Sequence, residues 1–215
     1  MIINKEIGKT REYKTKTQNL SRQLRIGIIV DIRSVTTIEL HKLIVGLLIS
    51  APDSLFEYMG NAEDQMVMAR HFNVMRGLKQ CYRQLISEFD EQMTRGWKTL
   101  LLGKSGPIIH IAGGRPSEMM NCFSRRASDQ FGPLLEILES HIAELIDVEV
   151  EDVFHPLSPG YLLQAFWHGT AMLGLNREER LLVVPLFSRF VIDRLGIVLA
   201  VANDMLVNRV EYPDA

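Results

Sequence analysis

A chain of 215 residues, 47% hydrophobic and 23% charged, is long enough to bury a sizeable core and too apolar to be disordered throughout. Its formal net charge of −2 provides no overall attraction to nucleic acid or to an anionic membrane. These values favour one globular domain, with or without a tail.

Cysteine usage and the first residues favour a cytoplasmic protein. Cys81 and Cys122 have no CxxC spacing, so we expect free thiols in a reducing compartment. The N-terminal stretch MIINKEIGKTREYK lacks the apolar segment of a secretory signal. No continuous apolar run comes near the roughly 18–20 residues that cross a bilayer, and we therefore expect no membrane segment.

Residues 1–34 are predicted to form a basic N-terminal arm, with eight lysines and arginines against three acidic residues. Such an arm could contact nucleic acid weakly, but a solvated tail explains the same charges and is the favoured interpretation. Within the arm, Ile26–Ile32 is rich in β-branched residues. This stretch could form a short strand or an extended segment docked on helices.

Residues 35–210 are predicted to form a helical domain. Thr36 or Thr37 can cap a first helix, and Pro52 lies where a new helical turn could begin, with Gly60 as its end. The longest pattern is Ala62–Leu101, where Asn61 is a candidate cap and Asp64 a first-turn carboxylate. Its large apolar residues recur every three or four positions, which predicts an amphipathic helix of about ten turns.

The second half of the domain contains several helix boundaries. Leu102–Pro116 holds four glycines and two prolines, which predict a connecting loop. Ser117 can cap the next helix, which Gly132-Pro133 should kink or divide. Ser158-Pro159 should start a shorter helix that Gly174 ends. Asn176 should cap a last helix to about Asn208, bent by Pro185. The fold is predicted to be all-α, an irregular bundle of five or six amphipathic helices.

The run DSLFEYMGNAEDQMVMARHFNVMRGLKQCYRQLISEF, with its Asp53–Glu57 and Met75-Arg76 elements, resembles the signature of a proteobacterial family of unknown function, number sixteen-thirty-one in its series. Two further blocks are similar in the same order: NCFSRRASDQFGPLLEILESHIAELI and HPLSPGYLLQAF…ERLLVVPLFSRFVIDRLGIVLAVANDML. The second block contains the specific elements Pro156–Pro159 and Leu186–Val191. The resemblance extends from Val35 to Met205 and implies a short form covering the family's N-terminal helical region. GPIIHIAGGRPSE stands where members carry an acidic stretch, and the family implies no reaction and no catalytic residues.

No catalytic constellation is recognisable in the sequence. The six histidines show no metal-ligand spacing, and no nucleophile motif is present, so we expect no enzyme activity, no cofactor and no metal. Arg115, Arg125 and Arg126 could together bind a phosphate or carboxylate, although a solvated helix face explains them too and is the favoured interpretation.

The leading hypothesis is a non-enzymatic helical module that binds an unidentified protein as a regulator or adaptor. Ile108, Ile109 and Ile111, held between glycines, are the predicted partner contact. A homodimer is also possible, because the long apolar stripe needs partner surfaces. The alternative hypotheses are a sensor for a small anionic ligand such as a signalling nucleotide, and weak nucleic-acid binding through the arm.

Overall fold

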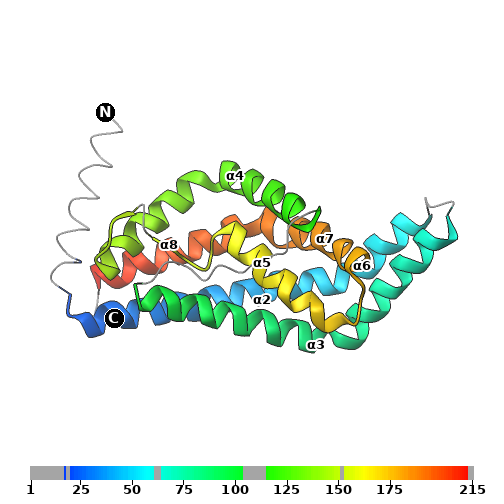
Figure 1. Ribbon diagram of the computed structural model, residues 1–215. Helices are drawn as coiled ribbons and strands as arrows, with labels where there is room; N and C mark the ends of the chain where they lie inside the picture. Colours follow the sequence, from blue (N-terminus) through cyan, green and yellow to red (C-terminus); the bar gives the residue numbers. More distant parts are fainter. Residues whose placement is uncertain (1–16, 18–19, 61–63, 104–114, 151–152, 213–215) are drawn as a thin grey trace.

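The computed structural model describes residues 17, 20–60, 64–103, 115–150 and 153–212, and every regular element in these ranges is helical. The prediction of an all-α bundle is confirmed (Figure 1). The elements in chain order are α2 (Arg22–Gly60), α3 (Gln65–Leu101), α4 (Arg115–Ile146), α5 (Pro159–Gly169), η2 (Thr170–Leu173), α6 (Arg177–Leu181), α7 (Val183–Phe190), η3 (Ile192–Arg194) and α8 (Leu195–Glu211).

Helices α2 and α3 form a long antiparallel hairpin whose tip projects beyond the other helices (Figure 1). The predicted long helix is confirmed, and from Leu78 onward its apolar stripe is largely in the core. Phe72, near the tip, is 58% exposed although Val74 is fully buried, so Phe72 lies on the outer side of the helix at this level. Asp64 is the helix cap itself, since its carboxylate accepts the Met66 backbone N–H at 2.8 Å. The prediction of Asp64 as a first-turn residue is wrong, and Asn61 lies outside the described residues.

The expected extended segment at Ile26–Ile32 is wrong, because this stretch lies within α2. Ile28, Ile29 and Ile32 are all buried, and their spacing of one and three residues places them on one helical face. Helix α2 therefore runs across the predicted division between arm and domain at residue 34. It also continues through Pro52 to Gly60, so Pro52 does not begin a separate helix.

Helix α5 packs closely against α3 and supports the centre of the bundle. A Cβ atom on Gly96 would lie 2.8 Å from Cε1 of Tyr161 and 2.9 Å from Cβ of Pro156, so only glycine permits this approach. Further along α5, Phe166 stacks on Phe187 of α7 with ring centroids 3.9 Å apart. Both rings are fully buried, and Phe187 also packs edge-on against Phe89 of α3, so the three rings join α3, α5 and α7.

The predicted boundaries in the C-terminal half are largely confirmed. Ser158 precedes α5 with Pro159 in its first turn, and Gly174 ends η2 with a left-handed φ of 64°. Asn176 caps α6 in a reciprocal capping box with Glu179. The predicted last helix is divided, because Pro185 has no N–H to donate to Leu181 and the chain breaks before α7. Gly132-Pro133 does not divide α4.

Candidate docking surface

The three predicted ligand-binding arginines lie on α4 but are not brought together. Arg115 is its first residue and Arg125 follows ten positions later, a rise of about 15 Å along the axis. Arg125 and Arg126 are consecutive, so they point about 100° apart around the helix. The side chain of Arg115 is outside the described residues. The ligand hypothesis stays a prediction, with no convergent site among the described groups to support it.

Arg126 makes contacts within the bundle. Its Nη2 donates to Oδ1 of Asp193 at 2.5 Å and to Oγ of Ser188 at 3.1 Å. The guanidinium also lies over the ring of Phe123, 5.3 Å from its centroid. These contacts tie α4 to α7 and η3, so the charge of Arg126 is already matched by a carboxylate.

The predicted partner contact lies outside the described residues. Ile108, Ile109 and Ile111 belong to the segment 104–114, between α3 and α4. The prediction that they contact a partner is therefore untested by the structure.

The histidines of the described chain serve packing and local hydrogen bonds. His41 pairs with Asp90 across the α2–α3 hairpin at 2.7 Å, and His155 lies 3.2 Å from Glu139. Burial lowers the pKa of His141 to about 4, so this ring is neutral at physiological pH. Within the described ranges, no three His, Cys, Asp or Glu side chains are grouped as metal ligands would be.

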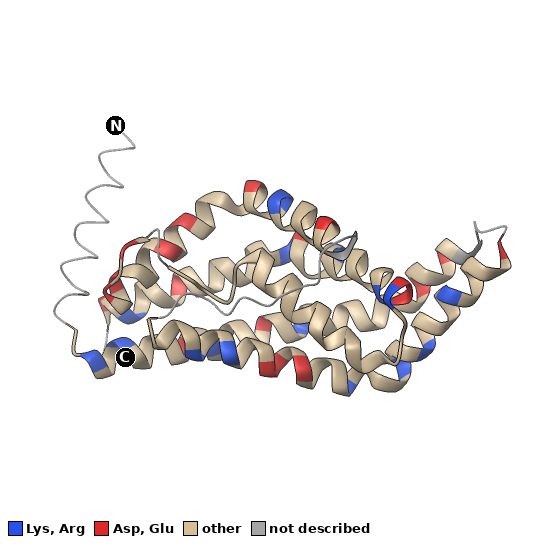
Figure 2. Cartoon of the chain, in the orientation of Figure 1, with Lys and Arg blue, Asp and Glu red and all other residues tan. Residues whose placement is uncertain are grey.

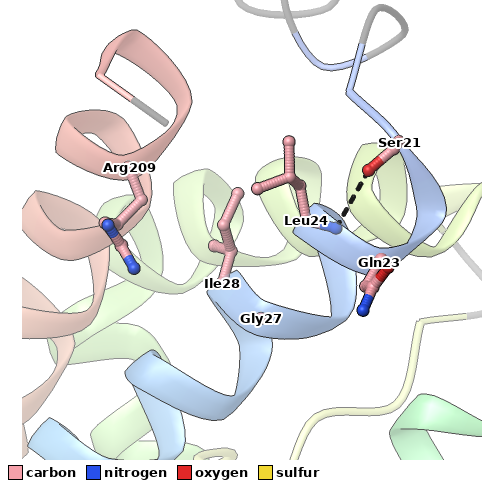
Figure 3. A pocket seen from close by; sticks show the side chains of 6 residues that line it. All are labelled: Ser21, Gln23, Leu24, Gly27, Ile28 and Arg209. Carbon is pink, nitrogen blue, oxygen red and sulfur yellow. Dashed lines mark hydrogen bonds between the residues drawn. The ribbon is translucent and has the colours of Figure 1, made fainter. Parts of the chain in front are cut away.

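A shallow cavity of about 310 Å³ opens between the N-terminal end of α2 and the C-terminal end of α8 (Figure 3). Ser21, Leu24, Gly27, Ile28 and Arg209 are among its lining residues. Oγ of Ser21 accepts the Leu24 N–H at 3.3 Å, and Arg209 donates to Oδ2 of Asp31 at 2.6 and 2.9 Å. The side chains of Ser21 and Arg209 in this cavity therefore already make hydrogen bonds within the chain.

Helix α2 is apolar on two opposite faces. One face is buried in the bundle, and the other is exposed at the molecular surface. Its inner face, with Ile32, Leu40, Ile44 and Leu47, is fully buried against α3, α7 and α8. Its outer face exposes Ile38 (56%), Val45 (47%), Ile49 (72%) and Phe56 (66%). We call these four residues, together with Lys42 and Pro52 between them, the outer stripe of α2. A helix that is apolar all round normally has both faces covered.

Charges of both signs lie within the outer stripe, at Lys42, and beside it. Nζ of Lys42 lies 2.6 Å from Oε1 of Glu39, and Asp53 is exposed further along the same helix. Charged residues of both signs are interspersed over α3 and α4 as well (Figure 2). The stripe is thus an apolar track with a polar border, the usual anatomy of a protein contact surface.

The same helix is long and apolar enough to cross a membrane by length and composition. An 18-residue window within Arg22–Tyr58 has a mean hydropathy of 1.4, and 28% of it is buried in the bundle. The prediction of no membrane segment considered only uninterrupted apolar runs, and it stays untested. In this fold, the inner face of the helix is core.

The chain is an all-α protein with an exposed apolar helix face and, among its described residues, no group of His, Cys, Asp or Glu side chains that could hold a metal ion. Residues 119–209 match the family model of the DUF1631 N-terminal domain, a protein family of unknown function. The chain is therefore similar to this family over α4 to α8, and the match confirms the resemblance predicted from the sequence there. Neither the curated proteins nor the solved structures include a match.

Sequence reasoning missed the outer stripe because it assigned part of α2 to an arm and ended the first helix before Pro52. A signal was available. Ile38, Val45, Ile49 and Phe56 are separated by seven, four and seven residues, which is itself a helical spacing. These four residues lie on a different face of the helix from the buried residues. They align with one another only if the helix continues through Pro52.

Proposed function

We propose that this protein is a non-enzymatic, cytoplasmic helical module that acts as a regulator or adaptor, and that it binds another protein through the outer stripe of α2. The observation that carries the proposal is the exposure of Ile38, Val45, Ile49 and Phe56 in one track. Exposed apolar side chains in a continuous patch mark contact surfaces, whereas isolated ones do not.

The packing of α2 supports a protein contact in preference to insertion into lipid. Leu40, Ile44 and Leu47 are fully buried in the bundle, and a membrane-spanning α2 would have to leave these contacts. Glu39 and Lys42 would also enter the hydrocarbon region, where each charge costs roughly 2.5–3.5 kcal/mol on insertion scales.

Site-specific photocrosslinking in living cells tests the proposal. A benzophenone amino acid at position 49 should give discrete protein adducts, because Ile49 is the most exposed residue of the stripe. The same amino acid at position 137 is the matched control, since Ile137 is 47% exposed on α4, away from the stripe. Protein adducts at position 49 that exceed those at 137 support the proposal. Equal labelling at both positions, or co-sedimentation with lipid vesicles in place of protein adducts, contradicts it.

A further inference from the structure

The outer stripe of α2 has the spacing of a helix–helix seam. Ile38, Lys42, Val45, Ile49, Pro52 and Phe56 follow one another in alternating steps of four and three residues. This alternation is the repeat of two helices that pack side by side with their seam residues interlocked. The six positions span about 27 Å at 1.5 Å per residue.

The seam is also symmetric about its own midpoint. Ile38 and Phe56 lie nine residues on either side of Leu47, Lys42 and Pro52 lie five, and Val45 and Ile49 lie two. Two copies of α2 that cross antiparallel at Leu47 therefore bring each seam residue opposite its symmetric counterpart. Large apolar side chains then meet in four layers, as a two-fold interface requires.

The charges at the border of the seam fit the same arrangement. In the antiparallel pair, Lys42 faces Pro52 of the second copy, and Asp53 is the next residue along that helix. The flexible stem of lysine can cover the proline while its ammonium group, which pairs with Glu39 in its own chain, also reaches the Asp53 carboxylate at the edge. Two-fold symmetry forms this Lys42–Asp53 pair twice, so the charges favour this register.

Gly46 fits the same arrangement. It lies between Lys42 and Asp53 on the same flank of α2, and a Cβ atom there would meet nothing within 4 Å in its own chain. Gly27 of the same helix is equally open, so the open space alone does not identify a partner. Gly46 differs from Gly27 in its place beside the seam, where the missing side chain leaves room for a second helix to cross.

From these observations we infer that the occupant of the outer stripe is a second copy of this chain, bound through α2 in an antiparallel, two-fold dimer centred on Leu47. This inference rests on the proposed protein-binding role of the stripe and names its partner. The dimer leaves the projecting tips of the two α2–α3 hairpins pointing in opposite directions.

Sedimentation equilibrium of the purified chain tests the inference through charge reversal. Lys42→Glu and Asp53→Lys should each weaken dimerisation tenfold or more, because each places like charges across the seam. The double variant should restore the wild-type dissociation constant to within about threefold, since the swapped charges attract again. A wild-type chain that stays monomeric at several hundred micromolar, or a double variant no better than the singles, overturns the inference.

Glycine variants separate the dimer from the fold. Gly46→Ala and Gly27→Ala should both leave the monomer as stable or more stable, because neither new Cβ meets an atom of its own chain. Only Gly46→Ala should weaken dimerisation, by fivefold or more, because Gly27 lies outside the seam. Equal effects of both variants on the dissociation constant contradict the inference.

Disulfide trapping tests the orientation. In a background with Cys81 and Cys122 replaced by alanine, a mixture of Val45→Cys and Ile49→Cys chains should crosslink at least tenfold faster than either variant alone. Equal rates contradict an antiparallel seam.

The docking function and the dimer can be contradicted independently of each other. If position 49 captures a different protein in cells while the purified chain is monomeric, the docking function stands and the dimer does not.

Discussion

Tyr161 of α5 donates its hydroxyl hydrogen to the backbone carbonyl of Gln92 in α3, with the oxygens 2.5 Å apart and both groups buried. The hydrogen bond fixes α5 across the middle of the long hairpin. Removing the hydroxyl in Tyr161→Phe should lower the free energy of unfolding by about 1 kcal/mol, the usual net value of such a bond. Urea denaturation of both proteins at pH 7 measures the difference. An unchanged midpoint would show that the bond is not stabilising.

The same tyrosine should make the fold sensitive to alkali. Burial raises the pKa of Tyr161 to about 12 from an ordinary value of 10.0. Since the folded pKa lies above the unfolded one, the contribution is intact below pH 10 and is lost as pH rises toward 12. The loss should be on the order of 2 kcal/mol.

Denaturation profiles from pH 9 to 12 measure this alkaline loss. Tyr161→Phe is the control, because the variant has no phenol at this position to titrate. Parallel profiles for the two proteins would contradict the assignment.

His141 should give the opposite dependence on the acidic side. Burial lowers its pKa to about 4, below the ordinary value of 6.5. Its contribution to stability is therefore present above pH 6.5 and is lost as pH falls toward 4, because the unfolded state takes up the proton first. His141→Gln should flatten the decline in unfolding free energy between pH 6.5 and 4.5. Proton NMR of the ring should show titration near pH 4, and titration near 6.5 would refute the prediction.

The fold was largely predictable because its strongest signals are local. The stripe of α3, the proline at the start of α5 and the helix cap at Asn176 each depend on a few neighbouring residues, and the structure confirms all three. Ile26–Ile32 was misassigned because β-branched content indicates a strand when the neighbouring helices are unknown. Burial of Ile28 and Ile32 against the bundle outweighs that preference.

The candidate site was harder to predict than the fold. Which face of α2 is covered depends on α7 and α8, more than 120 positions further along the chain. The hypothesis that the three arginines bind a ligand also depended on contacts with residues far away in the sequence. Nothing in the sequence near Arg126 shows that Asp193 and Ser188 will contact it.

Arg126 should therefore behave as a structural residue. Arg126→Ala removes a hydrogen bond to buried Ser188 and a largely exposed ion pair with Asp193, so it should cost about 1 kcal/mol. Arg125→Ala, the matched control on the exposed face of α4, should change stability by less than about 0.5 kcal/mol. Chemical denaturation measures both effects. Calorimetric titration with a panel of nucleotides should give no heat with the wild type, and heat that Arg125→Ala abolishes would restore the ligand hypothesis.

The contact between α3 and α5 should be the part of the bundle least tolerant of added volume. In Gly96→Ala the new methyl group would lie 2.8 Å from the ring of Tyr161 and 2.9 Å from Pro156, so α5 would have to move away from α3. Overpacking of this kind typically costs about 1–3 kcal/mol, more than alanine contributes to helix propensity. Thermal unfolding should show a lower midpoint for Gly96→Ala and an equal or higher one for Gly27→Ala, where the space is open. If both variants were stabilised alike, α5 would be free to shift, and the close approach at Gly96 would not limit the packing of the bundle.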